Sequence, residues 1–89
     1  MKEIRYSNQF IRYYKLRIAT DERLQQDFRE SVEAFREDRT LVDDHALEDV
    51  MSGKRSFSIN DDYRVVYVER EDYYRFLDVG THEQVYRRS

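Results

Sequence analysis

The sequence contains no cysteine, no proline and no tryptophan, and it has only two glycines among 89 residues. Without cysteine the fold cannot rest on disulfide bonds or on thiolate-bound zinc. No apolar run approaches the about 20 residues that a membrane-spanning helix requires, and the N-terminus lacks the apolar core of a secretory signal. These absences lead us to expect a cytoplasmic protein that does not enter a membrane.

Net positive charge is also missing, because 16 lysines and arginines face 19 aspartates and glutamates, for a formal charge of −3. A protein that binds nucleic acid by electrostatics alone would normally be basic. The charge is unevenly placed, however. Residues 1–19 carry five basic and one acidic side chain, whereas residues 20–52 carry four basic and eleven acidic ones. If the acidic segment lies away from the functional surface, a locally basic face can exist on this protein.

Aromatic side chains are abundant, with eight tyrosines and five phenylalanines. A chain of this length buries only about 60% of its unfolded surface. Large rings compensate, because they fill the space between two layers from few positions. We therefore expect a single domain over residues 1–89, with a core of a few well-packed layers.

The first half of the chain shows one short strand pattern followed by two helical patterns. Residues 2–6 alternate as a strand does, and Ser7 is placed to cap a helix over residues 8–18. Thr20 is predicted to cap a second helix, whose apolar residues recur at helical spacing. This second stripe consists of Leu24, Phe28, Val32 and Phe35. We expect it to face the core.

The second half reads as a meander of three strands, which we place at residues 56–59, 63–68 and 73–79. Polar turns separate the three runs, and β-branched and aromatic residues dominate them. In the middle run, Val65 and Tyr67 fall on one face of the strand and Arg64 on the other. The meander therefore has one apolar face that helices must cover.

Two connecting segments are less regular. Residues 38–44 lose the helical period and are predicted as a loop, and His45–Val50 is predicted as a short helical turn. Thr81 and Gln84 have capping-box spacing around a last short helical turn. The resulting βααβββ order predicts a two-layer α+β domain, an antiparallel meander sheet with the two N-terminal helices packed on it.

Motifs for metal or acyl-transfer chemistry do not occur in the sequence. It has no glycine-rich phosphate loop, no HExxH and no serine or cysteine elbow. We therefore expect neither a metal site nor a cofactor.

Three residues of the meander and the C-terminal turn stand out. Arg64 lies in an otherwise apolar strand, so its guanidinium must pair with an anion or face a functional surface. The structural alternative is an ion pair with Asp62 or Asp78. His82 follows a strand end, a position that suits acid-base chemistry as well as simple exposure. Tyr86 lies one helical turn later on the same face, where it either packs on the sheet or contacts a substrate.

Two further candidates precede the meander. Lys54 and Arg55 are adjacent and could bind a phosphate, although such pairs are often merely solvated. His45 lies beside Asp43 and Asp44, where a carboxylate-paired imidazole could act as a base. Plain exposure of His45 is the alternative.

In residues 44–86 the order of motifs resembles the RelE/ParE toxin superfamily, most closely its YafQ-like branch. The motifs are Asp44-His45-x-Leu47, Ser56-Phe57-Ser58-Ile59, Asp62-Tyr63-Arg64-Val65-Val66-Tyr67 and Gly80-Thr81-His82 followed by Tyr86. The predicted βααβββ order matches that family's fold across the whole chain.

The resemblance implies a toxin of a type II toxin-antitoxin system that cuts mRNA in the ribosomal A site without a metal. A cognate antitoxin would hold it inactive in a hetero-oligomer. Attack of a ribose 2′-oxygen on the adjacent phosphate needs a base, an acid and cationic donors. Family positions with these roles match His45 and Asp62 for proton transfer or its support, His82 as the C-terminal catalytic histidine, Arg64 at the scissile phosphate and Tyr86 as the substrate-orienting aromatic.

This chain departs from the YafQ-like pattern at Ser58, where that pattern has a further histidine. His45 and His82 then remain as the acid-base set, with Asp62 in support. Two alternatives stay open: a ParE-like toxin that acts on DNA gyrase without cutting RNA, and an inactive RelE-fold interaction protein. The two histidines favour the nuclease, because the ParE-like branch lacks such a set.

Overall fold

The computed structural model describes residues 2–86 of the chain. Its elements are β1 (Glu3–Tyr6), α1 (Asn8–Arg17), α2 (Glu22–Glu37), the 3-10 turn η1 (Arg39–Val42), β2 (His45–Ala46), the 3-10 turn η2 (Asp49–Met51), β3 (Arg55–Ser58), β4 (Tyr63–Glu69), β5 (Tyr73–Thr81) and α3 (His82–Tyr86). Among these residues, no helix has both the length and the apolar character needed to cross a membrane.

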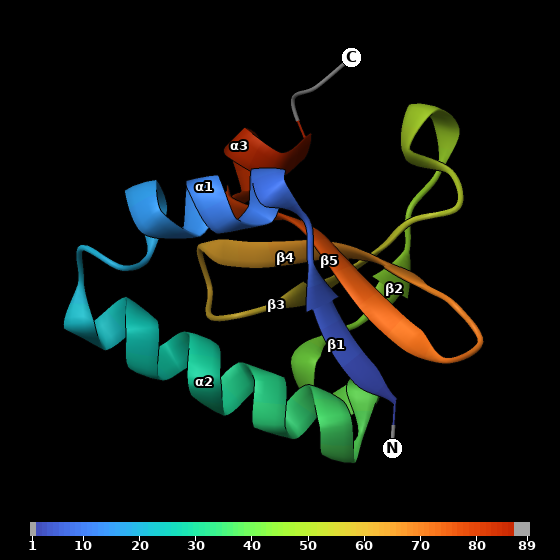
Figure 1. Ribbon diagram of the computed structural model, residues 1–89, viewed down its shortest axis with the longest axis horizontal. Coiled ribbons are helices and arrows are strands. Elements are labelled where there is room, and N and C mark those ends of the chain that lie inside the picture. The colour runs from blue at the N-terminus through green and yellow to red at the C-terminus, as the bar shows by residue number, and fades with distance from the viewer. Residues whose placement is uncertain (1, 87–89) are drawn as a thin grey trace.

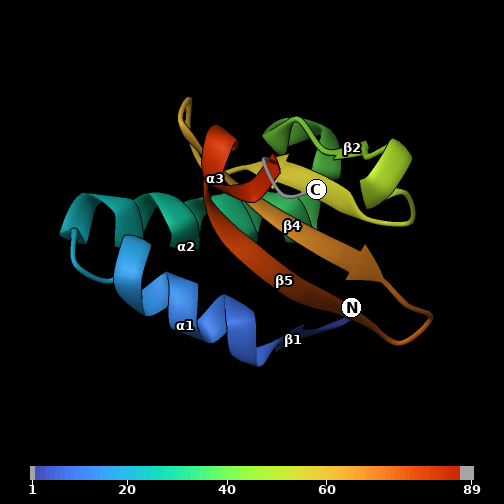
Figure 2. The ribbon, with the colours of Figure 1, turned by 90° about the horizontal axis from the view of Figure 1, so that it is seen from above.

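The strands form one sheet in the order β1-β5-β4-β3-β2, which can be followed from one edge to the other in Figure 2. The antiparallel meander β3-β4-β5 confirms the prediction. β1 pairs with β5 in parallel, so the two strands farthest apart in the sequence are neighbours. Figure 1 shows α2 below the strands and α3 above them. The predicted α+β fold is confirmed, with the short α3 on the second face.

Both long helices begin at a side-chain cap. Ser7 caps α1 as predicted, because its Oγ accepts a hydrogen bond from the Phe10 N–H at 3.0 Å. The prediction of Thr20 as the cap of α2 is wrong. Asp21 takes that position, and its carboxylate accepts from the N–H groups of Arg23 and Leu24. A carboxylate both satisfies these donors and complements the positive end of the helix dipole.

The helical turn predicted over His45–Val50 is largely wrong. His45 and Ala46 form β2, which pairs with β3 in antiparallel fashion, and only Asp49–Met51 form a 3-10 turn. The chain reaches β2 through Asp43, whose φ of 51° and ψ of 49° are left-handed. This reversal returns the backbone to the sheet, where pairing with β3 satisfies its hydrogen-bonding groups.

The sheet has two faces, and β4 defines them. We call the side that carries Val65 and Tyr67 the helix face, because these residues belong to the core cluster with Phe35 of α2. The Phe35 ring stacks on Phe57 with centroids 4.6 Å apart and meets Tyr67 edge-on. The side that carries Arg64 we call the α3 face. The α2 stripe thus packs as predicted, with Phe28 and Phe35 buried and Leu24 and Val32 half-buried.

Candidate functional site

Arg64 is the centre of a polar cluster on the α3 face. Only 8% of the residue is exposed. Its Nε donates to Ser56 Oγ at 2.8 Å and to the Tyr86 hydroxyl at 2.9 Å. Its two terminal nitrogens donate to Asp43, Nη2 to the carbonyl at 2.9 Å and Nη1 to the carboxylate at 3.4 Å. These contacts fix the plane of the guanidinium and leave its outer edge against an exposed carboxylate.

The two carboxylates considered as partners of Arg64 lie elsewhere. Asp78 is buried and forms an ion pair with Arg17 at 3.6 Å. Asp62 is exposed in the turn before β4, and its carbonyl accepts from the His82 N–H at 3.1 Å. The partner of Arg64 is therefore Asp43, which no local pattern singled out.

His82 reaches this cluster through Tyr86. The predicted capping box is present, because the Thr81 N–H donates to Gln84 Oε1 and the Gln84 N–H donates to Thr81 Oγ1. The exposed His82 ring packs edge-on against the Tyr86 ring, with centroids 4.5 Å apart. Tyr86 in turn donates to Ser56 Oγ. The capping box therefore fixes the beginning of α3, and the Tyr86 hydrogen bond fixes its end. The His82 imidazole remains exposed to solvent.

His45 lies on the other side of Arg64. Its Nδ1 is 3.3 Å from the Asp43 carbonyl and 3.5 Å from Arg64 Nη2. Nδ1 can donate to the carbonyl or accept from Arg64, depending on the tautomer. Nε2 makes neither contact, and the side chain is exposed. His45, Arg64, Tyr86 and His82 therefore form a continuous row from β2 across β4 to α3.

Arg55 and Lys54 are not part of this row. Arg55 lies on the helix face, where its guanidinium donates to Asp44 at 2.8 Å and to the Tyr67 hydroxyl at 3.3 Å. Lys54 directly precedes β3 and is half-buried, and within residues 2–86 no side-chain contact joins it to Arg64. The structure brings together the four predicted site residues of the row, with the Asp62 backbone beside them. Lys54 and Arg55 lie apart from this row.

A second polar network on the helix face anchors the segment that carries His45. The Asp44 side chain is only 3% exposed and accepts from the Tyr67 hydroxyl at 2.5 Å and from Arg55. Burial, followed by the bond to Asp44, raises the pKa of the Tyr67 phenol, so this group stays protonated. The bond to Asp44 likewise raises the pKa of Arg55. Asp43 and Asp44 thus serve opposite faces of the sheet.

Sequence reasoning missed Asp43 and Ser56 as members of the cluster. Ser56 had a usable signal, because it alternates with Phe57 and so belongs on the same face as Arg64 of the neighbouring strand. Asp43 had none, because its role depends on a left-handed backbone at a residue other than glycine.

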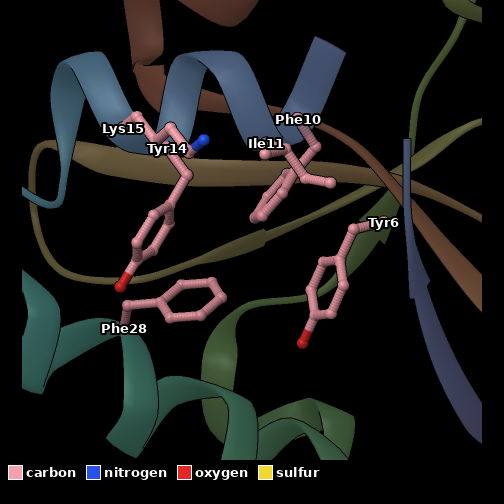
Figure 3. Close-up of a pocket in the computed structure, with 6 residues that line it drawn as sticks. All are labelled: Tyr6, Phe10, Ile11, Tyr14, Lys15 and Phe28. Carbon is pink, nitrogen blue, oxygen red and sulfur yellow. The ribbon is translucent and has the colours of Figure 1, made fainter. Parts of the chain in front are cut away.

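A separate cavity has an apolar lining and no comparable chemistry. This cavity of about 250 Å³ lies between α1, α2 and β1 (Figure 3), and Lys15 is the only lysine, arginine or carboxylate in its lining. The lining residues are Tyr6, Phe10, Ile11, Tyr14, Lys15 and Phe28. Within residues 2–86, no group of three histidine, aspartate or glutamate side chains is arranged to hold a metal ion.

Comparison with known proteins identifies the family. The model of the YafQ family, described as a bacterial toxin of a type II toxin-antitoxin system, matches residues 2–87. The chain belongs to the YafQ toxin family. This membership confirms the resemblance to the RelE/ParE superfamily. Among curated proteins, no sequence matches the chain.

Solved structures of YafQ and related toxins share the fold. YafQ from E. coli strain BL21(DE3) is 21% identical with a TM-score of 0.74, covering 97% of this chain and 99% of that one. YafQ in the E. coli DinJ–YafQ complex is 24% identical with a TM-score of 0.71 over the same shares. The Staphylococcus aureus YoeB dimer is 20% identical with a TM-score of 0.72, covering 91% and 97%.

Proposed function

We propose that this YafQ-family toxin is a metal-independent endoribonuclease that cuts mRNA in the ribosomal A site. The observation that carries the proposal is the row His45, Arg64, Tyr86 and His82, in which two exposed imidazoles flank one oriented guanidinium. Two imidazoles and a guanidinium can supply the base, the acid and the cation that transfer of the phosphoryl group from the 5′-oxygen to the 2′-oxygen needs.

In the proposed reaction one proton leaves the attacking 2′-hydroxyl and another is added to the departing 5′-oxygen. His45 Nε2 takes the proton of the ribose 2′-hydroxyl as its oxygen bonds to the adjacent phosphorus. The bond to the 5′-oxygen breaks, and protonated His82 supplies a proton to this leaving group. The products are a 2′,3′-cyclic phosphate and a 5′-hydroxyl. No water or metal enters this step.

Arg64 stabilises the negative charge that gathers on the phosphate oxygens. In the free protein its terminal nitrogens contact Asp43, whose carboxylate is 77% exposed and lies at the long distance of 3.4 Å. The phosphate gains negative charge as the 2′-oxygen attacks, so in the transition state it can displace that weakly held carboxylate from the guanidinium fork. The bonds of Nε to Ser56 and Tyr86 keep the guanidinium in place during the exchange.

Tyr86 and Asp62 act as positioning residues. The Tyr86 ring supports one side of the His82 imidazole, and its hydroxyl contacts Arg64, so it couples the acid to the cation. The Asp62 carbonyl holds the His82 N–H at the start of α3. Both contacts limit the positions that the imidazole can take, which preorganises the proton transfer.

A cognate antitoxin is the partner that we propose for this toxin. YafQ is found in complex with DinJ, and YoeB of Staphylococcus aureus in complex with YefM. By analogy, this chain forms a hetero-oligomer with its own antitoxin and acts in the cytoplasm, where ribosomes translate mRNA. The alternative of a gyrase-directed toxin is less well supported, because it gives no role to two imidazoles beside Arg64.

Cleavage of mRNA on purified ribosomes tests the proposal. Wild-type toxin and Glu83→Gln, a matched change at the exposed neighbour of His82, are expected to give codon-phased cuts at equal rates. His82→Gln is expected to cut about 10² to 10⁴ times more slowly, because the leaving oxygen loses its acid. Equal rates for His82→Gln and wild type would remove the proposed role of His82, and DNA damage with intact mRNA would indicate the gyrase alternative.

A further inference from the structure

Two arginines lie directly beside each other on the α3 face, at the end of the sheet away from the candidate site. The parallel register of β1 and β5 pairs Arg5 with Arg75, and both residues are exposed. Their neighbours Ile4 and Tyr74 pack against the core, so alternation turns both guanidinium groups to the other face. Neighbouring strands are about 4.8 Å apart. Like charges in this arrangement repel and destabilise the sheet.

The anions near this pair do not neutralise it. Arg5 stacks over the Tyr73 ring at 4.0 Å and forms a loose ion pair with Glu3 at 3.4 Å, in which both side chains are more than half exposed. Such an exposed pair contributes little and is easily replaced. Within residues 2–86, Arg75 has no ion pair. The stacking on Tyr73 holds Arg5 in place.

The arginine pair is aligned with the candidate site. Arg75 pairs with Val68 of β4, and Arg64 lies four residues earlier on the same strand and the same face. At about 3.3 Å per residue, this separation is roughly 13 Å along the sheet. Asp78, which pairs with Val66 between them, is 5% exposed and engaged with Arg17. Val66 and Val68, which lie between them on the same face of β4, are buried, so RNA that meets both cationic positions passes over the segments that cover this part of the strand.

We propose that Arg5 and Arg75 form a second RNA phosphate site, which holds the nucleic acid at a distance from the phosphate that Arg64 contacts. The ligand is a phosphodiester of RNA, because paired guanidinium groups match its oxygens. This inference rests on the proposed function for its direction, but binding does not depend on cleavage. It gives a repulsive arginine pair on an acidic protein a role that offsets its cost.

Binding of a short fluorescein-labelled single-stranded RNA, followed by anisotropy at several salt concentrations, tests the site. Arg5→Gln with Arg75→Gln is compared with Arg12→Gln and Arg29→Gln, which removes the same charge from exposed helix positions. The first variant is expected to bind about tenfold more weakly for every RNA sequence. Its plot of log affinity against log salt is expected to lose about one unit of slope. The control is expected to match wild type.

The same variants on ribosomes distinguish the source of the phosphate. Weaker binding to free RNA indicates the mRNA strand, whereas weaker binding only to ribosomes without mRNA indicates ribosomal RNA. Affinities equal to those of the control in both assays would overturn the site. The Tm of the double variant checks its folding: it loses the repulsion between the two guanidinium groups together with the exposed Arg5–Glu3 pair, so little change is expected. If wild-type toxin binds RNA through this pair and yet cuts nothing, the nuclease proposal fails and the phosphate site stands.

Discussion

The two faces of the sheet differ in how their polar side chains are satisfied. On the helix face, Asp44, Arg55 and Tyr67 bond to one another, and the Asp44 side chain is 3% exposed. On the α3 face, Arg64 is equally anchored, but the two histidines beside it are exposed. The helix-face network stabilises the fold, and its polar groups are satisfied by one another. In the α3-face cluster, hydrogen bonds fix Arg64 while the neighbouring imidazoles remain exposed to solvent, as a binding or catalytic site requires.

The largest expected loss of stability comes from a substitution in the core on the helix face. Phe35→Ala is expected to lower the free energy of unfolding by about 3–5 kcal/mol, because it removes the ring that packs on Phe57 and Tyr67. Urea denaturation measures the loss. Leu16→Ala is the control, since Leu16 is 65% exposed and its removal should change little. A loss below about 1 kcal/mol at Phe35 would mean that α2 does not anchor the helix face.

On the α3 face, substitutions at Arg64 should change the rate of RNA cleavage. Arg64→Ala is expected to slow single-turnover cleavage by about 10² to 10³, comparable to the loss of one donor to a transition-state anion. Arg64→Lys is expected to recover little, because an ammonium cannot contact Ser56, Tyr86 and a phosphate at once. The Tm of each variant separates rate from folding. Wild-type rates for Arg64→Ala would contradict the site.

Asp44 connects the two faces and should affect both quantities. Asp44→Asn is expected to cost about 1–3 kcal/mol of unfolding free energy, because Arg55 and Tyr67 lose a charged acceptor. Cleavage should also slow, since the neighbouring His45 loses its anchor. Glu48→Gln, an exposed change in the same segment, provides the control. A stable, fully active Asp44→Asn variant would show that the network does not position His45.

The smallest effect concerns pH. Bonds from Lys2, and then from Arg39, hold the pKa of Glu69 below its ordinary value of 4.5. A depressed pKa stabilises the fold above 4.5, and this contribution is lost as the pH falls through the folded value. Glu69→Gln is therefore expected to cost about 0.5 kcal/mol at neutral pH. The difference should vanish in acid, as urea denaturation of both proteins at both pH values can test. A difference independent of pH would exclude this ion pair as its cause.

The assignment of residues to the two faces of the sheet could largely be predicted from local sequence patterns. The alternation of β4 placed Arg64 opposite Val65 and Tyr67, and helical spacing placed Tyr86 beside His82. The same alternation already assigned Arg55 to the face of Phe57, so its separation from Arg64 was readable in the sequence. Placing Arg55 in a phosphate site overlooked that register.

Other features depend on contacts that no local pattern encodes. The pairing of Arg5 with Arg75 exists only because β1 lies parallel to β5, 70 residues away in the chain. The left-handed Asp43 comes from the return of the chain into the sheet. The expected charge separation is only partly realised. The acidic α2 lies on the helix face, while Asp43 remains beside the site.

Chemical analysis of the cut ends of ribosome-bound mRNA tests the central claim most directly, since it reports which oxygen attacks the phosphorus. Two imidazoles and Arg64, acting as proposed, leave a 2′,3′-cyclic phosphate on the upstream fragment and a 5′-hydroxyl on the downstream one. A 5′-phosphate with a free 3′-hydroxyl would show that water is the nucleophile, and the proposed roles of His45 and His82 would then be wrong.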